Sequence, residues 1–365
     1  MADDIYFSSV KNKKNTAQYT EKLDGAKAPQ RQPSPSSSGA SKGKGTSASG
    51  GKKKTNKKKK KKKIGIKAAV GIISGFVVLG LVVGLGISSV ILKVLKNYNS
   101  NQMAENQYVD EAQLLSSDNV YNVLLMGIDT LNTSNSSRSD AMILLSVDSK
   151  HNKIKLTSFL RDTYVDIPGH GSAKLNAACV YGGPQLVCDT IEYNFGIKID
   201  DYAKIGYDLF IEIIDAIGGV TIPEIDSVEA AALAKEGYSV TPGTNIKLDG
   251  YHALLYCRIR SGQNDFYRTT RQREVITQCI KQVMGTNPMT LIDVATNIAS
   301  KTESSIDQSE FVPLGMKAVA CIGTVEQFSV PADGTWYNDM INSQAVLVVD
   351  FSANKQKLNE FIYEQ

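Results

Sequence analysis

Three stretches of the sequence decide the fold: VYNVLLMGI at residues 120–128, AMILLSV at 141–147 and KIKLTSF at 153–159. The first two are nearly continuous apolar runs of strand length, and the third alternates apolar with polar residues. Runs of this length between polar segments are typical of buried β-strands. We therefore predict that a folded domain begins at residue 120 with three successive strands.

Helical and strand-like patterns alternate through the rest of the chain. The pair Gly182 and Gly183 separates two helical segments, and Gly218 with Gly219 ends a third. Strands that alternate with helices predict an α/β domain, in which a mixed central sheet is flanked by helices on both faces. The expected helices are 175–181, 184–195, 207–217, 249–258, 268–284, 288–299, 307–321 and 354–363, and the further expected strands are 199–205, 220–222, 325–330 and 346–350.

Charge is divided unevenly along the chain. Residues 1–63 contain eighteen Lys or Arg and four Asp or Glu, whereas the remaining residues contain 23 basic and 33 acidic ones. The first segment is rich in Ser, Gly, Lys, Pro and Gln and lacks apolar runs, so we expect it to be disordered. A basic tail joined to an acidic body indicates a membrane or nucleic-acid surface at the basic end.

An uncharged segment at residues 68–92 follows the basic tail. At about 1.5 Å per residue, a helix of this length spans roughly 37 Å, enough to cross the hydrocarbon core of a bilayer. The alternative, a cleavable signal peptide, has its apolar core near the start of the chain. Ten lysines at residues 52–63 precede the segment. The positive-inside rule keeps them in the cytoplasm, and their position favours contact with anionic lipid over the alternative of a nucleic-acid tail.

The expected location is therefore the cell membrane, with a single pass, a cytoplasmic N-terminus and an extracellular C-terminal domain. Gly71 and Gly75, like Gly80 and Gly84, have the G-x-x-x-G spacing that allows a homodimer through the transmembrane helix. Glycine is common in membrane helices in any case. The predicted parts are a disordered basic cytoplasmic tail at 1–63, a transmembrane helix at 64–96, an extracellular connector at 97–119 and an extracellular catalytic domain at 120–365.

All five cysteines lie in the part that we expect to be exported. An oxidising compartment permits disulfides, and Cys179 and Cys188 are the nearest pair in sequence. The alternative is that each cysteine is a small buried hydrophobic residue. No C-x-x-C or His/Cys cluster indicates a metal. The five are Cys179, Cys188, Cys257, Cys279 and Cys321.

Arginine is used sparingly after the basic tail: residues 64–365 hold sixteen lysines and seven arginines. A guanidinium donates two parallel hydrogen bonds to a phosphate, which an ammonium cannot do. Arginines set apart in an acidic domain therefore indicate a phosphate or pyrophosphate site. The alternative is an arginine–carboxylate network that holds the fold together. The arginines fall in three segments: Arg138; Arg161; and Arg258, Arg260, Arg268, Arg271 and Arg273.

Two carboxylates stand at neighbouring strand ends. Asp129 follows the first predicted strand and Asp140 opens the second. Mg²⁺ is typically held by one or two carboxylates together with phosphate oxygens and water, and it favours departure of a phosphate leaving group. These residues are therefore the predicted metal ligands, although Asp129 could equally cap the following turn.

The third arginine segment also shows a helical spacing. If it is helical, at least two of Arg268, Arg271 and Gln272 share a face. Asp265 lies just before them and could orient an arginine or accept a proton from an attacking hydroxyl.

Taken together, these segments resemble the LytR–CpsA–Psr (LCP) family of cell-wall glycopolymer ligases. The resemblance covers about residues 120–285, in the family's order. The matching segments are VLLMGID (123–129), RSDAMIL (138–144), SFLRDTY (158–164), KLNAACVYGG (174–183), LDG (248–250), RIR (258–260), DFYR (265–268) and RQR (271–273).

The resemblance implies a three-layer fold with a hydrophobic pocket for a polyprenyl chain. It also implies Mg²⁺-dependent transfer of a glycopolymer from a polyprenyl-pyrophosphate carrier to peptidoglycan, with formation of a phosphodiester. In that interpretation Asp129 and Asp140 hold the metal, and Asp265, Arg138 and Arg161 are catalytic. The pyrophosphate ligands are Arg138, Arg161, Arg258, Arg260, Arg268 and Gln272.

The sequence departs from the family pattern in one loop, where Asn264 and Tyr267 stand in place of glycines and the segment between Arg260 and Asp265 is short. Two other functions use the same features. One is a pyrophosphatase that releases the lipid phosphate with water. The other is a non-catalytic envelope regulator or lipid-phosphate sensor, for which a metal at the leaving group is not needed.

Overall fold

The computed structural model describes residues 101–128, 138–260, 265–286, 290, 294, 301–321 and 323–365. All of them belong to the second of two structural units, residues 81–365. The predicted basic tail and transmembrane segment lie outside the described residues, as does nearly all of the predicted helix at 288–299. Within the described ranges, no helix combines the length and apolarity that crossing a bilayer requires.

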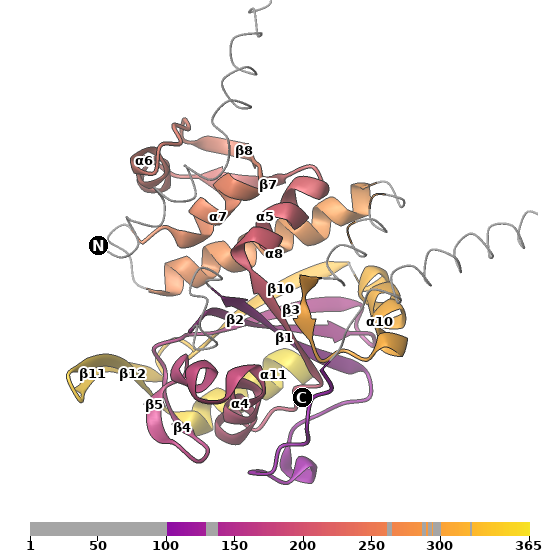
Figure 1. Ribbon diagram of the computed structural model, residues 1–365, viewed down its shortest axis with the longest axis vertical. Coiled ribbons are helices and arrows are strands. Elements are labelled where there is room, and N and C mark those ends of the chain that lie inside the picture. Colours follow the sequence, from indigo (N-terminus) through magenta and orange to yellow (C-terminus); the bar gives the residue numbers. More distant parts are fainter. Residues whose placement is uncertain are drawn as a thin grey trace, which may run out of the picture. The chain divides into compact units, whose positions relative to one another are not determined.

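A six-stranded mixed sheet forms the centre of the domain (Figure 1). Strand pairs β1–β2, β2–β3 and β6–β9 are antiparallel, whereas β1–β6 and β3–β10 are parallel. The predicted fold class and the first three predicted strands are confirmed. In spatial order the strands are β10 (Thr324–Val330), β3 (Lys153–Phe159), β2 (Ser139–Asp148), β1 (Val120–Ile128), β6 (Asp201–Gly206) and β9 (Glu303–Ser304).

Helices cover both faces of this sheet (Figure 1). Because successive side chains of a strand point to opposite faces, Met142 and Leu144 pack with residues of α4 and α11, whereas Ile143 and Leu145 pack with residues of α8 and α10. Burial on both faces explains why these strands are continuous apolar runs. One face carries α4 (Ala177–Phe195) and α11 (Phe351–Tyr363), and the other carries α5 (Tyr207–Ala216), α7 (Gly250–Arg258), α8 (Asp265–Gly285) and α10 (Gln308–Ala320).

Three two-stranded ribbons and a short helix complete the described fold. The ribbons are antiparallel strand pairs with exposed residues in every strand. Only β7 and β12 coincide with predicted strands, because the other strands lack an apolar run. The elements are β4 (Tyr164–Ile167) with β5 (Gly171–Lys174), β7 (Val220–Ile225) with β8 (Gly243–Leu248), β11 (Trp336–Ile341) with β12 (Gln344–Val349), and α6 (Ser227–Lys235).

The predicted break between two helical segments at Gly182–Gly183 is confirmed: α4 is kinked there, and neither glycine has helical backbone angles. Gly183 has a φ of 67°, which L-residues rarely adopt, and Pro184 follows it. Cys179 and Cys188 lie in this helix, and all five cysteines are free. Four of the five are buried, so they are small hydrophobic residues of the core rather than disulfide partners.

Residues 101–119, which we assigned to a connector, pack on the domain. The backbone N–H of Leu115 donates to Gly196 O, and Leu115 O accepts from Lys198 N–H, at 2.8 and 3.0 Å. Leu114 is buried, and one 3-10 turn, η1 (Glu111–Gln113), precedes it. These residues therefore form part of the folded body.

Candidate diphosphate-binding site

Strand pairing brings distant segments to one end of the sheet. Gly127, near the carboxyl end of β1, is paired with both Ala141 of β2 and Ile205 of β6. Strand β3 is antiparallel to β2 and ends at Phe159, so Arg161 emerges at the same end. The first residues of β2 and the residues that follow β3 are therefore neighbours.

Arg161 and Asp140 form an ion pair at this end of the sheet. Arg161 Nη1 lies 2.9 Å from Asp140 Oδ1. The other carboxylate oxygen, Oδ2, accepts a hydrogen bond from the hydroxyl of Tyr207, the first residue of α5, at 3.2 Å. Tyr207 was not predicted as a site residue. Asp140 is thus held from two separate elements.

Helix α8 adds a second arginine and a second carboxylate. Arg268 Nη2 lies 2.8 Å from Asp265 Oδ2 and donates to the backbone oxygen of Asp140 at 3.3 Å. Asp265 Oδ2 also lies 3.7 Å from Arg161 Nε. Asp265 therefore stands between two guanidinium groups that are 107 positions apart in sequence.

Each of these two arginines has a side-chain N–H group that donates no hydrogen bond to any described residue. Among the described residues, buried side-chain atoms without a hydrogen-bond partner include Arg161 Nε, Arg268 Nε and Gln272 Oε1. A buried N–H group that donates to nothing costs roughly 1–3 kcal/mol, so such groups normally meet a ligand or water. Two neighbouring guanidinium N–H groups that lack a hydrogen-bond acceptor in the described part of the chain suit an anion.

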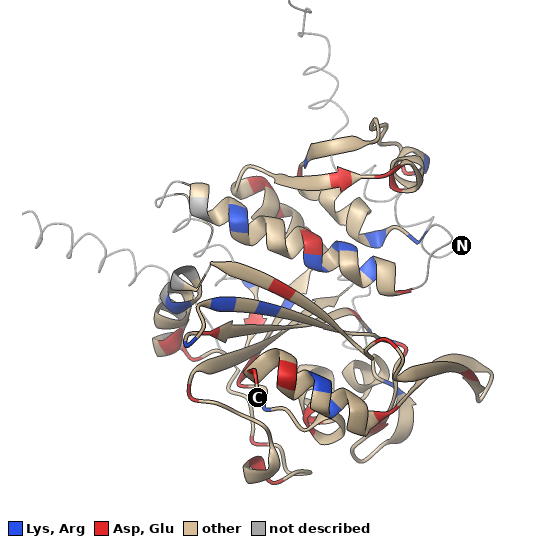
Figure 2. Ribbon diagram, turned by 180° about the vertical axis from the view of Figure 1, so that it is seen from behind, with Lys and Arg blue, Asp and Glu red and all other residues tan. Residues whose placement is uncertain are grey.

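The electrostatic setting of the two arginines differs. Burial lowers the pKa of Arg268, with the Asp265 carboxylate opposing the effect. Burial also acts to lower the pKa of Arg161, but the carboxylates of Asp265, Asp162 and Asp140 outweigh it and leave that pKa raised. Both guanidinium groups stay protonated. Positions occupied by Lys or Arg recur along the α8 ribbon in Figure 2.

A pocket opens beside these charges. Arg258 and Arg260, which end and follow α7, line it together with Arg268 and Gln272. The Arg258 guanidinium lies 5.0 Å from the ring centroid of Tyr207. A charged rim next to an apolar wall matches an amphiphile with an anionic head. The apolar wall consists of Gly127, Ala141, Ile205, Phe210, Leu254 and Cys257.

The structure sorts the remaining predicted residues into three groups. Asp129 lies outside the described residues. Arg138 is exposed and directly precedes β2. Arg271 and Arg273 turn away from the pocket: Arg271 Nε pairs with Glu229 Oε1 at 2.6 Å, and Arg273 Nε donates to Gln327 Oε1 at 3.2 Å. Of the helical trio, Arg268 and Gln272 share the pocket face.

Of the two predicted magnesium ligands, only Asp140 is among the described residues. Both of its carboxylate oxygens accept hydrogen bonds from the protein, from Arg161 and from Tyr207. Its side chain remains one-third exposed at the pocket wall, so it is accessible to a hydrated cation. Mg²⁺ commonly uses one carboxylate with phosphate oxygens and water. The donor chemistry fits, provided that a bound ion replaces one of these two hydrogen bonds.

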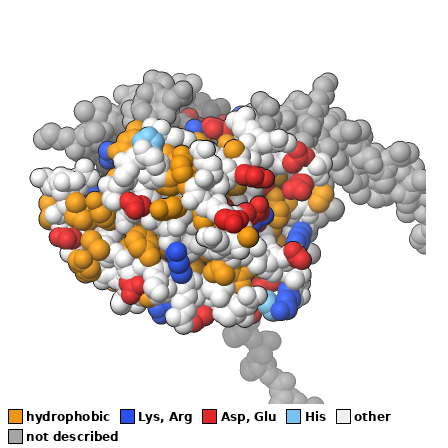
Figure 3. Space-filling model, turned by 90° about the horizontal axis from the view of Figure 1, so that it is seen from below, with side chains coloured by type: hydrophobic (Ala, Val, Ile, Leu, Met, Phe, Trp, Pro, Cys, Tyr) orange, Lys and Arg blue, Asp and Glu red, His pale blue; other side chains and the backbone are white. Residues whose placement is uncertain are grey.

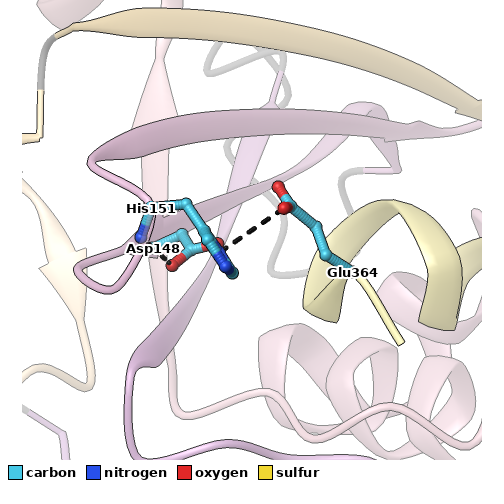
Figure 4. A group of neighbouring side chains, drawn as sticks. All are labelled: Asp148, His151 and Glu364. Atoms are coloured by element: carbon cyan, nitrogen blue, oxygen red, sulfur yellow. Dashed lines mark hydrogen bonds and ion pairs between the residues drawn. The ribbon is translucent and has the colours of Figure 1, made fainter.

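Another group of potential metal ligands lies elsewhere, at the hairpin between β2 and β3. Asp148, His151 and Glu364 offer ligand atoms within 4.8 Å of one another (Figure 4). However, Lys155 Nζ is fully buried there, 2.9 Å from Asp148 Oδ2 and 3.0 Å from Glu364 Oε1. The ammonium already neutralises these carboxylates and would repel a metal ion. We interpret the group as an ion-pair network that ties α11 to the sheet.

Curated relatives share this chain's sequence over most of the described domain. A protein from Enterococcus faecalis is 32% identical over 273 residues, covering 72% of this chain and 85% of the relative. One from Halalkalibacterium halodurans is 31% identical over 238 residues, covering 63% and 76%. Both are named polyisoprenyl-teichoic acid–peptidoglycan teichoic acid transferase TagU. Biofilm regulatory protein A of Streptococcus mutans is 30% identical over 247 residues.

Solved structures share the fold. "TagT bound to LIIa-WTA" superimposes with a TM-score of 0.60 at 23% identity, covering 72% of this chain and 99% of that one. A family protein, YwtF (TagT), "with bound octaprenyl pyrophosphate lipid" gives 0.57 at 22% identity, with the same coverage. The family model LytR_cpsA_psr matches residues 88–361, three-quarters of the sequence. The chain belongs to the LytR_cpsA_psr family.

Proposed function

We propose that this chain is a membrane-anchored glycopolymer phosphotransferase of cell-wall assembly. Its donor is a glycopolymer on a polyprenyl-pyrophosphate carrier, its acceptor is peptidoglycan, and its product is a phosphodiester. The observation that carries the proposal is the pair of buried guanidinium N–H groups, on Arg161 and Arg268, beside an apolar pocket. The names of the TagU relatives support the same donor and acceptor.

The pocket suggests how the donor binds. The polyprenyl chain lies against the apolar wall that Leu254 and Phe210 help to form. The diphosphate lies at the rim, where Arg161, Arg258, Arg260, Arg268 and Gln272 neutralise and orient it, and Arg138 approaches from the start of β2. Phosphoryl transfer depends mostly on such positioning and charge stabilisation.

In the transfer step, an acceptor hydroxyl oxygen forms a bond to the polymer-side phosphorus. The bond from that phosphorus to the bridging oxygen breaks, and the polyprenyl monophosphate leaves with that oxygen. The hydroxyl proton passes to water at the open rim. Arginines at the bridging and leaving oxygens stabilise the negative charge that develops there.

Asp140, together with Asp129, is the proposed holder of Mg²⁺. When bound, the ion neutralises the diphosphate and favours departure of the phosphate leaving group. Asp140 also fixes Arg161 through their 2.9 Å contact. Binding of Mn²⁺ in place of Mg²⁺, followed by magnetic resonance in the absence of donor and with Asp140→Asn as the comparison, tests the metal role without measuring activity.

The proposed topology keeps residues 1–63 in the cytoplasm, crosses the membrane within 64–96 and exports 97–119 and the catalytic domain 120–365. The lysine run and the uncharged segment support it. Protease added to intact protoplasts should remove the C-terminal domain and leave an N-terminal tag protected. A tag that is digested, or a domain that is protected, contradicts this topology.

Transfer is tested with the full-length chain in detergent, a labelled polyprenyl-pyrophosphate glycopolymer and a peptidoglycan oligomer. Label linked to the acceptor is the expected product; release of the label with water alone identifies a pyrophosphatase. Arg161→Ala should lower the rate roughly 10- to 150-fold, the equivalent of about 1.5–3 kcal/mol for a hydrogen bond to a charged group. Arg161→Lys should not restore it.

Arg273→Ala is the matched control, because it removes a buried guanidinium from α8 that bonds Gln327 rather than lining the pocket. Its folded fraction should retain the parent rate. Equal rates for the parent chain and Arg161→Ala would contradict the proposed site.

A further inference from the structure

The β11–β12 ribbon projects from the domain next to the candidate site (Figure 1). Its base is joined to the segment that carries Arg161. The N–H of Leu347 in β12 donates to Asp162 O at 2.9 Å, and Leu347 forms a parallel bridge with Thr163. One side of the ribbon is therefore fixed one residue beyond a diphosphate-binding arginine.

The other side of the ribbon's base contacts α8. The Trp336 ring is stacked on the Phe266 ring, with 4.9 Å between the centroids and 25° between the planes. Phe266 directly follows Asp265, whose carboxylate bonds Arg268. The first residue of β11 is thus packed on the first turn of the helix that supplies the site.

One face of β11 leads outward from this stack. Side chains alternate along a strand, so Trp336, Asn338 and Met340 share a face. From Trp336 to Met340 the strand covers about 13 Å, at about 3.3 Å per residue. Asn338 is exposed, and 64% of Met340 is exposed. Figure 3 shows hydrophobic side chains gathered on the side of the molecule where this ribbon and β4–β5 lie.

We propose that this face of the ribbon, Trp336, Asn338 and Met340, is the subsite for the glycan strand of the peptidoglycan acceptor. The inference rests on the proposed function and adds to it the place and the chemistry of acceptor recognition. A sugar ring has an apolar C–H face, which an aromatic ring or a thioether covers, and a hydroxyl edge, which an amide side chain bonds.

Continuity with the site favours a polymeric acceptor as the occupant. The hydroxyl that attacks must reach the phosphorus at the pocket rim, while the rest of the strand extends into solvent. The base of the ribbon contacts Asp162 and Phe266, and the ribbon projects outward from there. It therefore provides a surface along which such a strand could extend from the site into solvent. The length of the Trp336–Met340 row suits a short run of linked sugar rings.

Charge argues against a membrane as the occupant. Residues 336–349 contain no Lys or Arg, and Asp339 is their only charged side chain. Segments that bind anionic lipid headgroups carry clustered basic residues. The rings of a glycan strand carry polar hydroxyl groups, which do not require basic side chains for binding.

The chain itself supplies a reporter, because Trp336 is its only tryptophan. Soluble peptidoglycan glycan fragments are added to the full-length chain in neutral-lipid nanodiscs, and tryptophan emission is recorded. A saturable change that Asn338→Ala and Met340→Ala each weaken about fivefold or more supports the subsite. Tyr337→Ala is the matched control: Tyr337 is also exposed, at 60%, but lies on the opposite face and should change the affinity less than twofold.

The emission measurement detects binding without turnover. A failure of the proposed subsite can therefore be distinguished from a failure of the proposed transferase activity. In the transfer assay, Asn338→Ala and Met340→Ala should raise the KM for the acceptor about fivefold and leave the KM for the donor unchanged. No change in emission with glycan fragments overturns the subsite. So does an emission change with anionic vesicles that lack glycan, or equal weakening by Tyr337→Ala.

Discussion

Arg268 and Asp265 are bonded to each other across one turn of α8, with 2.8 Å between Nη2 and Oδ2. The same carboxylate oxygen faces Arg161 Nε at 3.7 Å. One carboxylate oxygen thus links the two guanidinium groups and fixes their positions relative to each other. Asp265 is therefore better suited to position the arginines than to act as a general base.

Replacement of Asp265 by Asn separates these two roles. An amide oxygen still accepts a hydrogen bond from Arg268, so the transfer rate should fall only about tenfold. Loss of a general base costs roughly 100- to 10,000-fold. The measurement is kcat across pH with saturating donor.

A fall of a thousandfold or more for Asp265→Asn, together with loss of the acidic limb of the pH profile, would restore Asp265 as the base. Asp265→Ala serves as the comparison. Because it also removes the anchor of Arg268, it should lose more activity than the amide variant.

Tyr207→Phe tests a residue whose role was not visible in the sequence. The variant removes the hydroxyl that donates to Asp140 Oδ2 at 3.2 Å, while the ring beneath Arg258 remains. Loss of one such bond to a carboxylate costs about 1.5 kcal/mol, equivalent to roughly tenfold in the transfer rate. Initial rates at low donor concentration measure it.

The control for Tyr207→Phe is the thermal midpoint, which should move little because the ring still packs. A rate equal to that of the parent chain would show that Tyr207 does not position Asp140 for catalysis.

The central strands could be predicted from the sequence because their side chains are buried on both faces of the sheet. Strands β1 and β3 have the predicted bounds. The ribbon strands β4, β5, β8 and β11 were missed, because exposed two-stranded ribbons impose no apolar pattern on their residues. Helix α8 begins at Asp265, three residues before the predicted start.

The site residues that could be predicted from the sequence were those whose residue type is itself informative. Arginines in an acidic body indicated a phosphate site. The structure places Arg258, Arg260 and Arg268 in the pocket lining, and Arg161 lies 2.9 Å from Asp140 of that lining. Which face each helical arginine takes depends on tertiary partners: Arg271 turns to Glu229 of α6. A tyrosine at a strand–helix junction has many uses, so Tyr207 gave no signal.

The buried pair Asp148 and Lys155 predicts a loss of stability in acid. Burial opposes ionisation of Asp148, but hydrogen bonds from His151 and Lys155 outweigh it and lower its pKa to about 2. The folded pKa lies below the unfolded one, so the stabilisation is present above about pH 4 and is lost as the pH falls towards 2. The expected loss is about 2–3 kcal/mol, at about 1.4 kcal/mol per pKa unit. Urea unfolding at several pH values measures it.

Asp148→Asn is the control and should abolish this part of the acid dependence. Lys155→Met should destabilise the chain by about 3–5 kcal/mol near pH 7, because it leaves a buried carboxylate without its ammonium partner. Unchanged stability of Lys155→Met would contradict the ion-pair network of Lys155 with Asp148 and Glu364.

For Asp200 we expect the opposite dependence of stability on pH. Burial raises its pKa to about 6, although it accepts a hydrogen bond from the backbone N–H of Asn122 at 2.7 Å. The folded pKa lies above the unfolded one, so folding favours the protonated acid, and stability falls as the pH rises from about 4 to about 6. Asp200→Asn keeps an acceptor for Asn122 and removes the charge. It should raise the free energy of unfolding at pH 7 by up to about 3 kcal/mol, at about 1.4 kcal/mol per pKa unit, and have little effect at pH 4.

Denaturant titrations of both chains at the two pH values measure this difference. Asp200 precedes β6, at the end of the sheet opposite the diphosphate site, so the transfer rate should not change. A variant less stable than the parent at pH 7 would mean that the ionised carboxylate is held favourably, for instance by Lys198 Nζ at 3.9 Å. The two carboxylates act in successive pH ranges: ionisation of Asp148 stabilises the fold as the pH rises from about 2 to about 4, and ionisation of Asp200 destabilises it from about 4 to about 6. Their combined contribution to stability should therefore be largest near pH 4, where Asp148 is ionised and Asp200 still carries its proton.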